Sequence, residues 1–130
     1  MSIDYKYDFD SNTVRMRAVG EITMGEITTY VSGVLADERV LPDFIELVDM
    51  EAVKDLTVNY NSVGPLKDLW MKYLSKGCLA TIIYAPSNIS YGTSRMIQTV
   101  VGLEAEGLSD RFFVVRTQEE VDAKLASLRT

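Results

Sequence analysis

The first twenty residues alternate between apolar and polar side chains. Polar turn residues at 10–12 divide this stretch into two segments. Apolar side chains recur at every second position of each segment: Tyr5, Tyr7 and Phe9, then Val14, Met16 and Ala18. Because alternate side chains of a β-strand point to the same face, this pattern predicts two half-buried strands. We therefore predict a β-hairpin that Gly20 ends.

After Gly20, stretches with helical spacing alternate with short apolar runs. The spacing of a capping box at 23–26 and at 117–120 indicates the starts of the first and last helices. A second helix is predicted from about 62 to 75, closed by Gly77. A third should begin at 87–90 and bury one stripe of apolar side chains: Met96, Ile97, Val100 and Val101.

The apolar runs at 44–48, 79–85 and 112–115 predict three further strands, and 51–60 is expected to be a mixed connection. The element order is therefore β-β-α-β-α-β-α-β-α. This order is typical of the α/β class, with a mixed, mostly parallel five-stranded sheet and about four helices. No linker or internal repeat divides the chain, so we expect a single domain over residues 1–130.

The composition excludes several kinds of site. The chain has no histidine and one cysteine, Cys78. Ser-His-Asp and Cys-His catalysis, histidine-ligated zinc and an internal disulfide are therefore excluded. We expect no metal site and no cofactor. Cys78 precedes an apolar run, so we expect a buried, unreactive thiol.

The charge pattern limits the partners. The net charge is -6, and Lys and Arg form no basic run, so we expect no nucleic-acid partner. The first residues lack the pattern of a signal peptide, and no stretch of eighteen apolar residues occurs. We expect a cytoplasmic protein with no transmembrane segment.

Three loops are expected beyond the carboxyl ends of the parallel strands, where open α/β sheets bind ligands. They span 49–62, 86–95 and 116–117. The first leads into the second helix through Asn61 and Ser62, and helix capping by either side chain is the simpler interpretation. The alternative is regulatory, because a phosphate on Ser62 would face the positive end of the helix dipole and could switch partner binding.

The element order and this serine together resemble the STAS family of bacterial domains. This family includes anti-sigma factor antagonists and SpoIIAA-like relatives with a SEC14-like architecture. The antagonists carry Asp-Ser-Ser-Gly at their phosphorylated turn, where this chain has Asn61-Ser62-Val63-Gly64. The segments 20–23 and 80–84 look like those of the uncharacterised SpoIIAA-like branch. The resemblance covers most of the chain and implies a cytoplasmic, regulatory, protein-binding domain.

The second loop gathers hydroxyl groups and one cation at the expected start of the third helix: Ser90, Tyr91, Thr93 and Arg95. The helix dipole disfavours an arginine in a first turn, so we expect Arg95 to have a partner. One of the chain's own carboxylates, Asp49, Glu51 or Asp55, is the simpler partner. The alternative is a small anion held by Arg95 together with backbone N–H groups and the hydroxyls.

Two functions remain from the sequence. The first is a non-enzymatic regulatory or protein-interaction module of unidentified partner, because without histidine no general base is visible. The alternative is a carrier or sensor of a lipid or small anion, with a site at the carboxyl edge of the sheet that uses the 86–95 loop and a pocket beneath 51–60. Tyr60, Trp70 and Tyr73 could line such a pocket, although aromatic residues at helical spacing are usually core. A homodimer is also consistent with the sequence.

Overall fold

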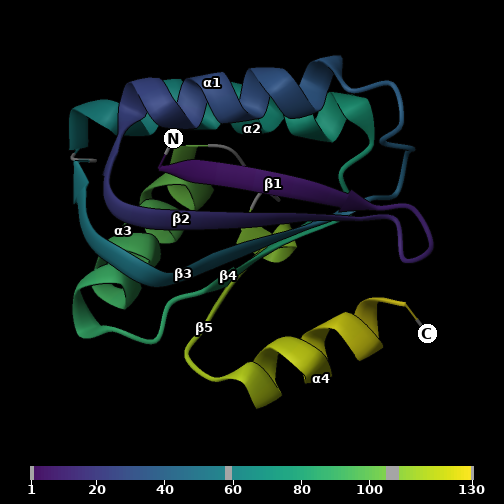
Figure 1. Cartoon of the computed structure of the whole chain (residues 1–130). Helices are drawn as coiled ribbons and strands as arrows, with labels where there is room; N and C mark the ends of the chain where they lie inside the picture. The colour runs from purple at the N-terminus through teal and green to yellow at the C-terminus, as the bar shows by residue number, and fades with distance from the viewer. Residues whose placement is uncertain (1, 58–59, 105–108, 130) are drawn as a thin grey trace.

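The predicted hairpin is present at the start of the chain (Figure 1). The computed structural model describes residues 2–57, 60–104 and 109–129, excluding the side chains of 60, 63, 100, 101, 103, 104 and 109. Strands β1 (Ile3–Asp8) and β2 (Thr13–Thr23) pair antiparallel. Asn12 turns the chain at a φ of 49°, and its Oδ1 atom accepts a hydrogen bond from the Tyr7 hydroxyl at 2.6 Å. The turn is thus fixed by a side chain of the strand that enters it.

The second and third strands are longer than predicted. Pairing between β1 and β2 ends at Ala18–Val19, just before Gly20 as predicted, but β2 itself continues to Thr23. Strand β3 spans Ile45–Thr57 and pairs in parallel with β2 along its length. The mixed connection predicted for 51–60 is therefore wrong as far as Thr57. Register shifts on both sides of Val19–Gly20 interrupt the pairing, and Gly20 has a φ of +77°. Such irregularities break the strict alternation of side chains, which hides the strand from a sequence pattern.

The helices begin and end close to their predicted positions. Thr23 and Glu26 form the predicted capping box, and Gly77 ends the second helix at a φ of +102°. No helix among the described residues is both long and apolar enough to cross a membrane. The helices are α1 (Met24–Ala36), α2 (Val63–Lys76), α3 (Asn88–Glu104) and α4 (Gln118–Leu128), and the remaining strands are β4 (Ala80–Tyr84) and β5 (Phe112–Val115).

The buried face of α3 differs from the predicted stripe. Ile97 packs against the core as expected, but Met96 is 39% exposed. Ser90 and Ser94 are buried instead. Side chains three and four residues apart share one face of a helix, so positions 90, 94 and 97 form the buried stripe. The predicted inward side chains of Val100 and Val101 lie outside the described residues.

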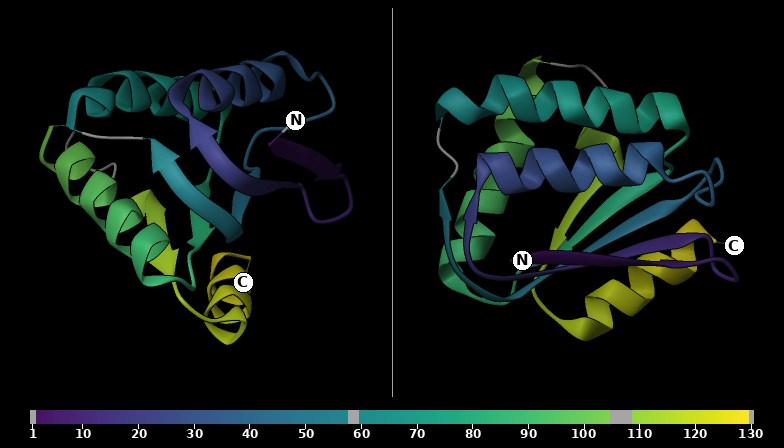
Figure 2. Two further views of the ribbon diagram at one scale, coloured as in Figure 1. Left: turned by 60° about the vertical axis from the view of Figure 1, so that its left-hand side comes forward. Right: turned by 45° about the horizontal axis from the view of Figure 1, so that its top comes forward.

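The five strands lie in the sheet in chain order, β1-β2-β3-β4-β5, and every neighbouring pair after β1–β2 is parallel. Helices α1, α2 and α3 cover one face of the sheet, whereas α4 lies on the other (Figures 1 and 2). This arrangement confirms the predicted α/β class with a mixed, mostly parallel sheet. It also brings the ends of β3, β4 and β5 to one edge.

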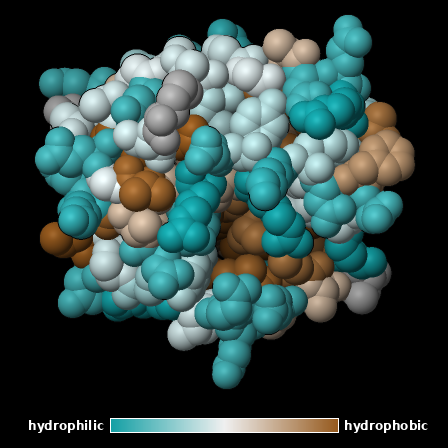
Figure 3. Space-filling view, viewed as in Figure 1, coloured by the Kyte–Doolittle hydropathy of each residue, from teal (hydrophilic) through white to brown (hydrophobic). Residues whose placement is uncertain are grey.

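Most of the core lies between the sheet and the three helices that share a face. Alternate residues of β3 face opposite sides, so Val48 packs in this larger cluster and Ile45 in a smaller one beneath α4. Beside α4, part of the second face is hollowed, and Figure 3 shows apolar side chains there flanked by hydrophilic ones. Charged and aromatic side chains contribute to the lining of this hollow, among them Lys6, Arg15, Arg17, Asp49 and Tyr84.

Candidate functional site

The serine-bearing turn lies at the start of α2, as predicted. A short 3-10 helix, Tyr60–Ser62, precedes α2, with Asn61 exposed and Ser62 half-buried. Ser62 has a φ of -83° and a ψ of -12°, and its hydroxyl makes no capping hydrogen bond. Capping normally requires extended backbone, which Thr23 has at the start of α1 with a φ of -106° and a ψ of 162°. Helix capping therefore does not explain Ser62, and a regulatory role of Asn61 and Ser62 stays a prediction.

Arg95 does not lie in the first turn of α3, so that prediction is wrong. Because α3 begins at Asn88, directly after Pro86 and Ser87, Arg95 lies beyond the second turn. The expected conflict with the helix dipole therefore does not arise. The side chain is exposed and donates from Nη1 to Oε1 of Gln98 at 2.6 Å. Among the described contacts, this amide is its partner in place of the three predicted carboxylates.

The predicted hydroxyl groups are divided between the core and the surface of α3. Ser90 is buried, and its hydroxyl lies 2.6 Å from that of Ser87. Its backbone N–H also donates to the Ser87 hydroxyl, at 3.1 Å. Tyr91 and Thr93 are half-buried. The structure therefore does not bring Ser90 and Arg95 to one surface, and an anion site built from this group stays a prediction.

A different arginine, Arg116, contacts the start of α3. Its Nη2 atom donates to the carbonyl of Pro86 at 3.0 Å and to Oδ1 of Asn88 at 2.6 Å. Its guanidinium carbon lies 4.7 Å from the centre of the Tyr91 ring. Arg116 follows β5 at the carboxyl edge of the sheet, which is the signal that could have identified it from the sequence. These contacts tie the end of β5 to the first turn of α3.

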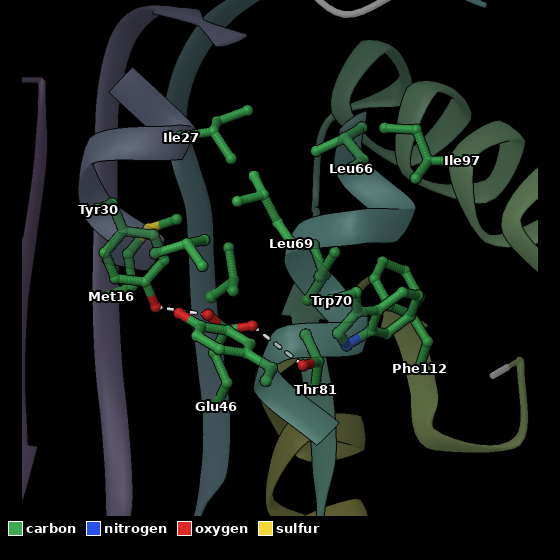
Figure 4. Close-up of a pocket in the computed structure, with 14 residues that line it drawn as sticks. Met16, Ile27, Tyr30, Glu46, Leu66, Leu69, Trp70, Thr81, Ile97 and Phe112 are labelled. Atoms are coloured by element: carbon green, nitrogen blue, oxygen red, sulfur yellow. Dashed lines mark hydrogen bonds between the residues drawn. The ribbon is translucent and has the colours of Figure 1, made fainter. Parts of the chain in front are cut away.

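A cavity of about 140 Å³ lies between the sheet and helices α1, α2 and α3 (Figure 4). Trp70 and Tyr73 line it, whereas the side chain of Tyr60 lies outside the described residues. The described residues 51–57 do not line it, so it is not the pocket that we predicted beneath 51–60. Three helices and four strands contribute to the lining: Met16, Ile27, Tyr30, Val31, Glu46, Val48, Leu66, Leu69, Trp70, Tyr73, Thr81, Ile83, Ile97 and Phe112.

Glu46 forms the polar end of this cavity. It projects from β3 on the same face as Val48 and is 5% exposed. The Tyr30 hydroxyl donates to Oε2 at 2.5 Å, and the Thr81 hydroxyl donates to Oε1 at 3.0 Å (Figure 4). Burial raises the pKa of Glu46 above its ordinary value, although the neighbouring hydroxyl groups of Tyr30, Tyr73 and Thr81 oppose this. Sequence reasoning missed Glu46, and the available signal was a lone acid inside an apolar strand.

The titratable groups around Glu46 remain neutral near physiological pH. Burial raises the pKa of Tyr30 and of Tyr73, and the nearby Glu46 carboxylate adds to both shifts. Cys78 is buried, and burial raises the pKa of its thiol to about 12, which confirms the prediction of a core cysteine. Among the described residues, no group of three His, Cys, Asp or Glu side chains could hold a metal ion. The polar chemistry of this cavity is therefore hydrogen bonding to one carboxyl group and its neighbouring hydroxyls.

Glu46 should make protein stability depend on pH. Because its pKa is raised in the folded state, the folded protein holds this proton more tightly than the unfolded chain does. The resulting stabilisation is fully present below the ordinary pKa of 4.5 and is lost as pH rises through the folded-state pKa. We expect the free energy of unfolding, measured by urea denaturation, to fall as pH rises from 4.5 through the folded-state pKa, with a slope of at most about 1.4 kcal/mol per pH unit.

Glu46→Gln is the matched control for this pH dependence. Glutamine keeps the shape of the side chain, and the hydroxyls of Tyr30 and Thr81 can rotate to pair with its amide. Its unfolding free energy should therefore change less with pH over the same range. Titration of Asp37 does not contribute over this pH range, because the hydrogen bond from Arg39 holds the pKa of that carboxyl well below its usual range. Parallel curves for the two proteins would contradict the prediction.

No protein-family model and none of the curated proteins matches this chain, but solved structures do. The unphosphorylated form of the anti-sigma factor antagonist SpoIIAA aligns with a TM-score of 0.57 at 16% identity, covering 96% of this chain and 97% of that one. The chain has a SpoIIAA-like fold. Phosphorylated SpoIIAA from Bacillus aligns over 95% of this chain and 98% of its own, with a TM-score of 0.55 at 18% identity.

A third structure with a SpoIIAA-like fold is an uncharacterised protein of the DUF3478 family from Shewanella loihica PV-4. It aligns over 95% of this chain and 91% of its own, with a TM-score of 0.55 at 17% identity. The resemblance inferred from the element order is thus confirmed at the level of fold. Within this SpoIIAA-like fold, the serine-bearing turn precedes α2, and the Glu46 cavity lies beneath the same helix.

Proposed function

We propose that this protein is a non-enzymatic regulatory module that binds a partner protein through the surface at the start of α2. The observation that carries the proposal is the likeness to SpoIIAA over at least 95% of the chain. SpoIIAA is described as an anti-sigma factor antagonist, a role that acts on another protein, and it has been solved in phosphorylated and unphosphorylated forms. This support is an analogy at the level of fold, so the experiments below address the site itself.

The position of Ser62 supports a switch at this surface. The residue is half-buried beside the exposed Asn61, immediately before the first turn of α2. A phosphate there would add about two negative charges next to the positive end of the helix dipole. The first turn of α2 carries no acidic residue that would repel it. Phosphorylation would therefore change the charge of the surface without unfolding the helix.

The proposal is tested by the phosphorylation state of Ser62 and by the site of partner contact. We expect intact-mass and peptide mass spectrometry of protein from its native cells to find phosphate on Ser62 under at least one growth condition. A photo-crosslinking residue in place of Asn61 should capture the partner, and Ser62→Glu should change the affinity of that partner about tenfold or more.

Control positions come from surfaces far from this turn. Ser75→Ala, at an exposed serine near the other end of α2, should leave partner binding unchanged. A photo-crosslinking residue in place of the exposed Ala126 of α4 should capture no partner. The absence of phosphate under all conditions, together with equal capture from both crosslinking positions, would refute the proposal. Capture of a second copy of the chain would show that the partner is the protein itself, in a homodimer.

The second candidate, a small-ligand carrier or sensor, is favoured by a different observation. The lining of the Glu46 cavity combines many apolar side chains with one group of hydrogen-bonding atoms, as small-molecule sites commonly do. This location differs from the loop at Arg95 that the sequence indicated for a lipid or an anion.

A further inference from the structure

The cavity contains a buried hydroxyl group whose hydrogen-bonding capacity is unused. Tyr73 is 2% exposed, and among the described residues its hydroxyl has no hydrogen-bond partner of normal geometry. Leaving a buried hydroxyl unpaired costs roughly 1–3 kcal/mol, so such a group in a native protein requires an explanation, for example a bound molecule that pairs with it. The polar groups nearest to it, Tyr30 and Glu46, are already bonded to each other.

The size of the cavity limits what can pair with Tyr73. Its volume is about 140 Å³, and an apolar cavity of roughly 150 Å³ is known to hold a benzene-sized molecule. Apolar side chains from the sheet and from three helices form most of its wall, including Val48, Ile83 and Phe112. Partly exposed side chains of Ile27, Leu66 and Ile97 also line it, so the cavity lies within reach of the surface.

The charge of the lining selects against anions. Glu46 is the acidic group among the described lining residues, and no lysine or arginine is among them. A carboxylate or phosphate placed there would face Glu46 without a cation to balance it. The carboxyl oxygens of Glu46 retain lone pairs beyond the bonds from Tyr30 and Thr81, so they can accept one more hydrogen bond. A neutral hydroxyl group needs no balancing cation. It can also accept a hydrogen bond from Tyr73 and donate one to Glu46.

We propose that the cavity binds a small neutral molecule of one aromatic ring, or a comparable aliphatic group, that carries a single hydroxyl. The ring lies against the apolar wall between the sheet and α2, and the hydroxyl pairs with Tyr73 and Glu46. This site is separate from the surface at Ser62. Its test is therefore independent of any partner protein.

The experiment uses the full-length protein, with phenol, toluene and benzoate as probes of matched size. Isoleucine methyl groups report the location, because Ile27, Ile83 and Ile97 line the cavity whereas Ile45 and Ile82 pack in the cluster on the other face of the sheet. In methyl NMR titrations at neutral pH, we expect phenol to shift the first three signals and to leave the other two unchanged. We expect phenol to bind about fivefold or more tightly than toluene, and benzoate not to bind.

Two variants test the polar contact. Tyr73→Phe removes the unpaired hydroxyl, so it should keep or raise the melting temperature and remove the preference for phenol over toluene. Tyr84→Phe is the matched control, because Tyr84 belongs to the cluster on the other face of the sheet, and this variant should keep the preference. The proposal is overturned if phenol shifts none of the three cavity signals, if benzoate binds as well as phenol, or if Tyr73→Phe keeps the preference for phenol.

A variant that fills the cavity gives a further check. Ile83→Phe adds a ring to the floor of the cavity, so it should abolish binding of phenol and toluene while leaving the protein folded. Folding is checked by the unchanged methyl signals of Ile45 and Ile82. Unreduced phenol binding in the folded variant would place the ligand elsewhere and overturn the proposal.

Discussion

Phe44→Ala should lower the free energy of unfolding by about 3–5 kcal/mol, the range that is typical when a large aromatic side chain is removed from a core. The Phe44 side chain is 0% exposed, and its ring meets that of Tyr73 edge to face, with 5.7 Å between the ring centres. Removing it would leave a void beside the residue that supplies the unpaired hydroxyl of the cavity. Urea denaturation monitored by circular dichroism measures the loss.

Phe9→Ala is the matched control for this prediction. The chemical change is the same, but Phe9 is 67% exposed at the end of the first strand. Its replacement should change the free energy of unfolding by no more than about 0.5 kcal/mol. If both variants lose similar amounts of stability, the assignment of Phe44 to the core is wrong.

Gly77→Ala is expected to destabilise the protein by about 2–4 kcal/mol for two separate reasons. Gly77 ends α2 at a φ of +102°, a conformation that strains any residue with a Cβ atom. An added Cβ would also lie 2.9 Å from Cα of Pro42 and 3.0 Å from its Cβ, which forces the loop before β3 to move. The measurement is the same denaturation experiment.

Gly92→Ala controls for the general effect of replacing a glycine. Gly92 lies within α3, and an added Cβ would meet nothing within 4 Å. Alanine is the better helix former, so this variant should gain about 0.5–1 kcal/mol of stability. Opposite signs for the two substitutions are the expected result. A stability loss at Gly77 no larger than about 0.5 kcal/mol would show that the Pro42 contact does not constrain this turn.

Much of the fold could be predicted because local patterns and tertiary structure agree in this chain. Thr23 and Glu26 form a capping box from residues three apart, and Gly77 ends a helix through its own backbone freedom. Such features depend on neighbours along the sequence. The extension of β3 to Thr57 depends instead on pairing with β2 across two register shifts. The residues 51–57 show no alternating pattern that would predict a strand, because the register of their pairing with β2 is irregular.

The candidate site was harder to predict than the fold, because its chemistry depends on burial. The sequence placed Ser62 correctly at the start of α2, since that position follows from the helix boundary. It favoured Arg95 over Arg116 because only the structure shows which guanidinium reaches Tyr91 and Pro86. Glu46 resembled an ordinary strand residue until the helices that bring Tyr30 and Tyr73 against it were placed.

The agreement between strand order in the sheet and order in the chain bears on how the protein forms during translation. Each strand after the first meets, as it leaves the ribosome, a sheet partner that has already been made, and paired residues are at most 35 positions apart in the chain. The face of the sheet that carries Ile45 and Ile82 is covered later in translation, because the helix that packs on it, Gln118–Leu128, follows all five strands in the chain. A nascent chain that pauses before this helix exposes an apolar surface next to ordered strands. Translation speed just before the codons for this helix should therefore influence how much of the protein aggregates.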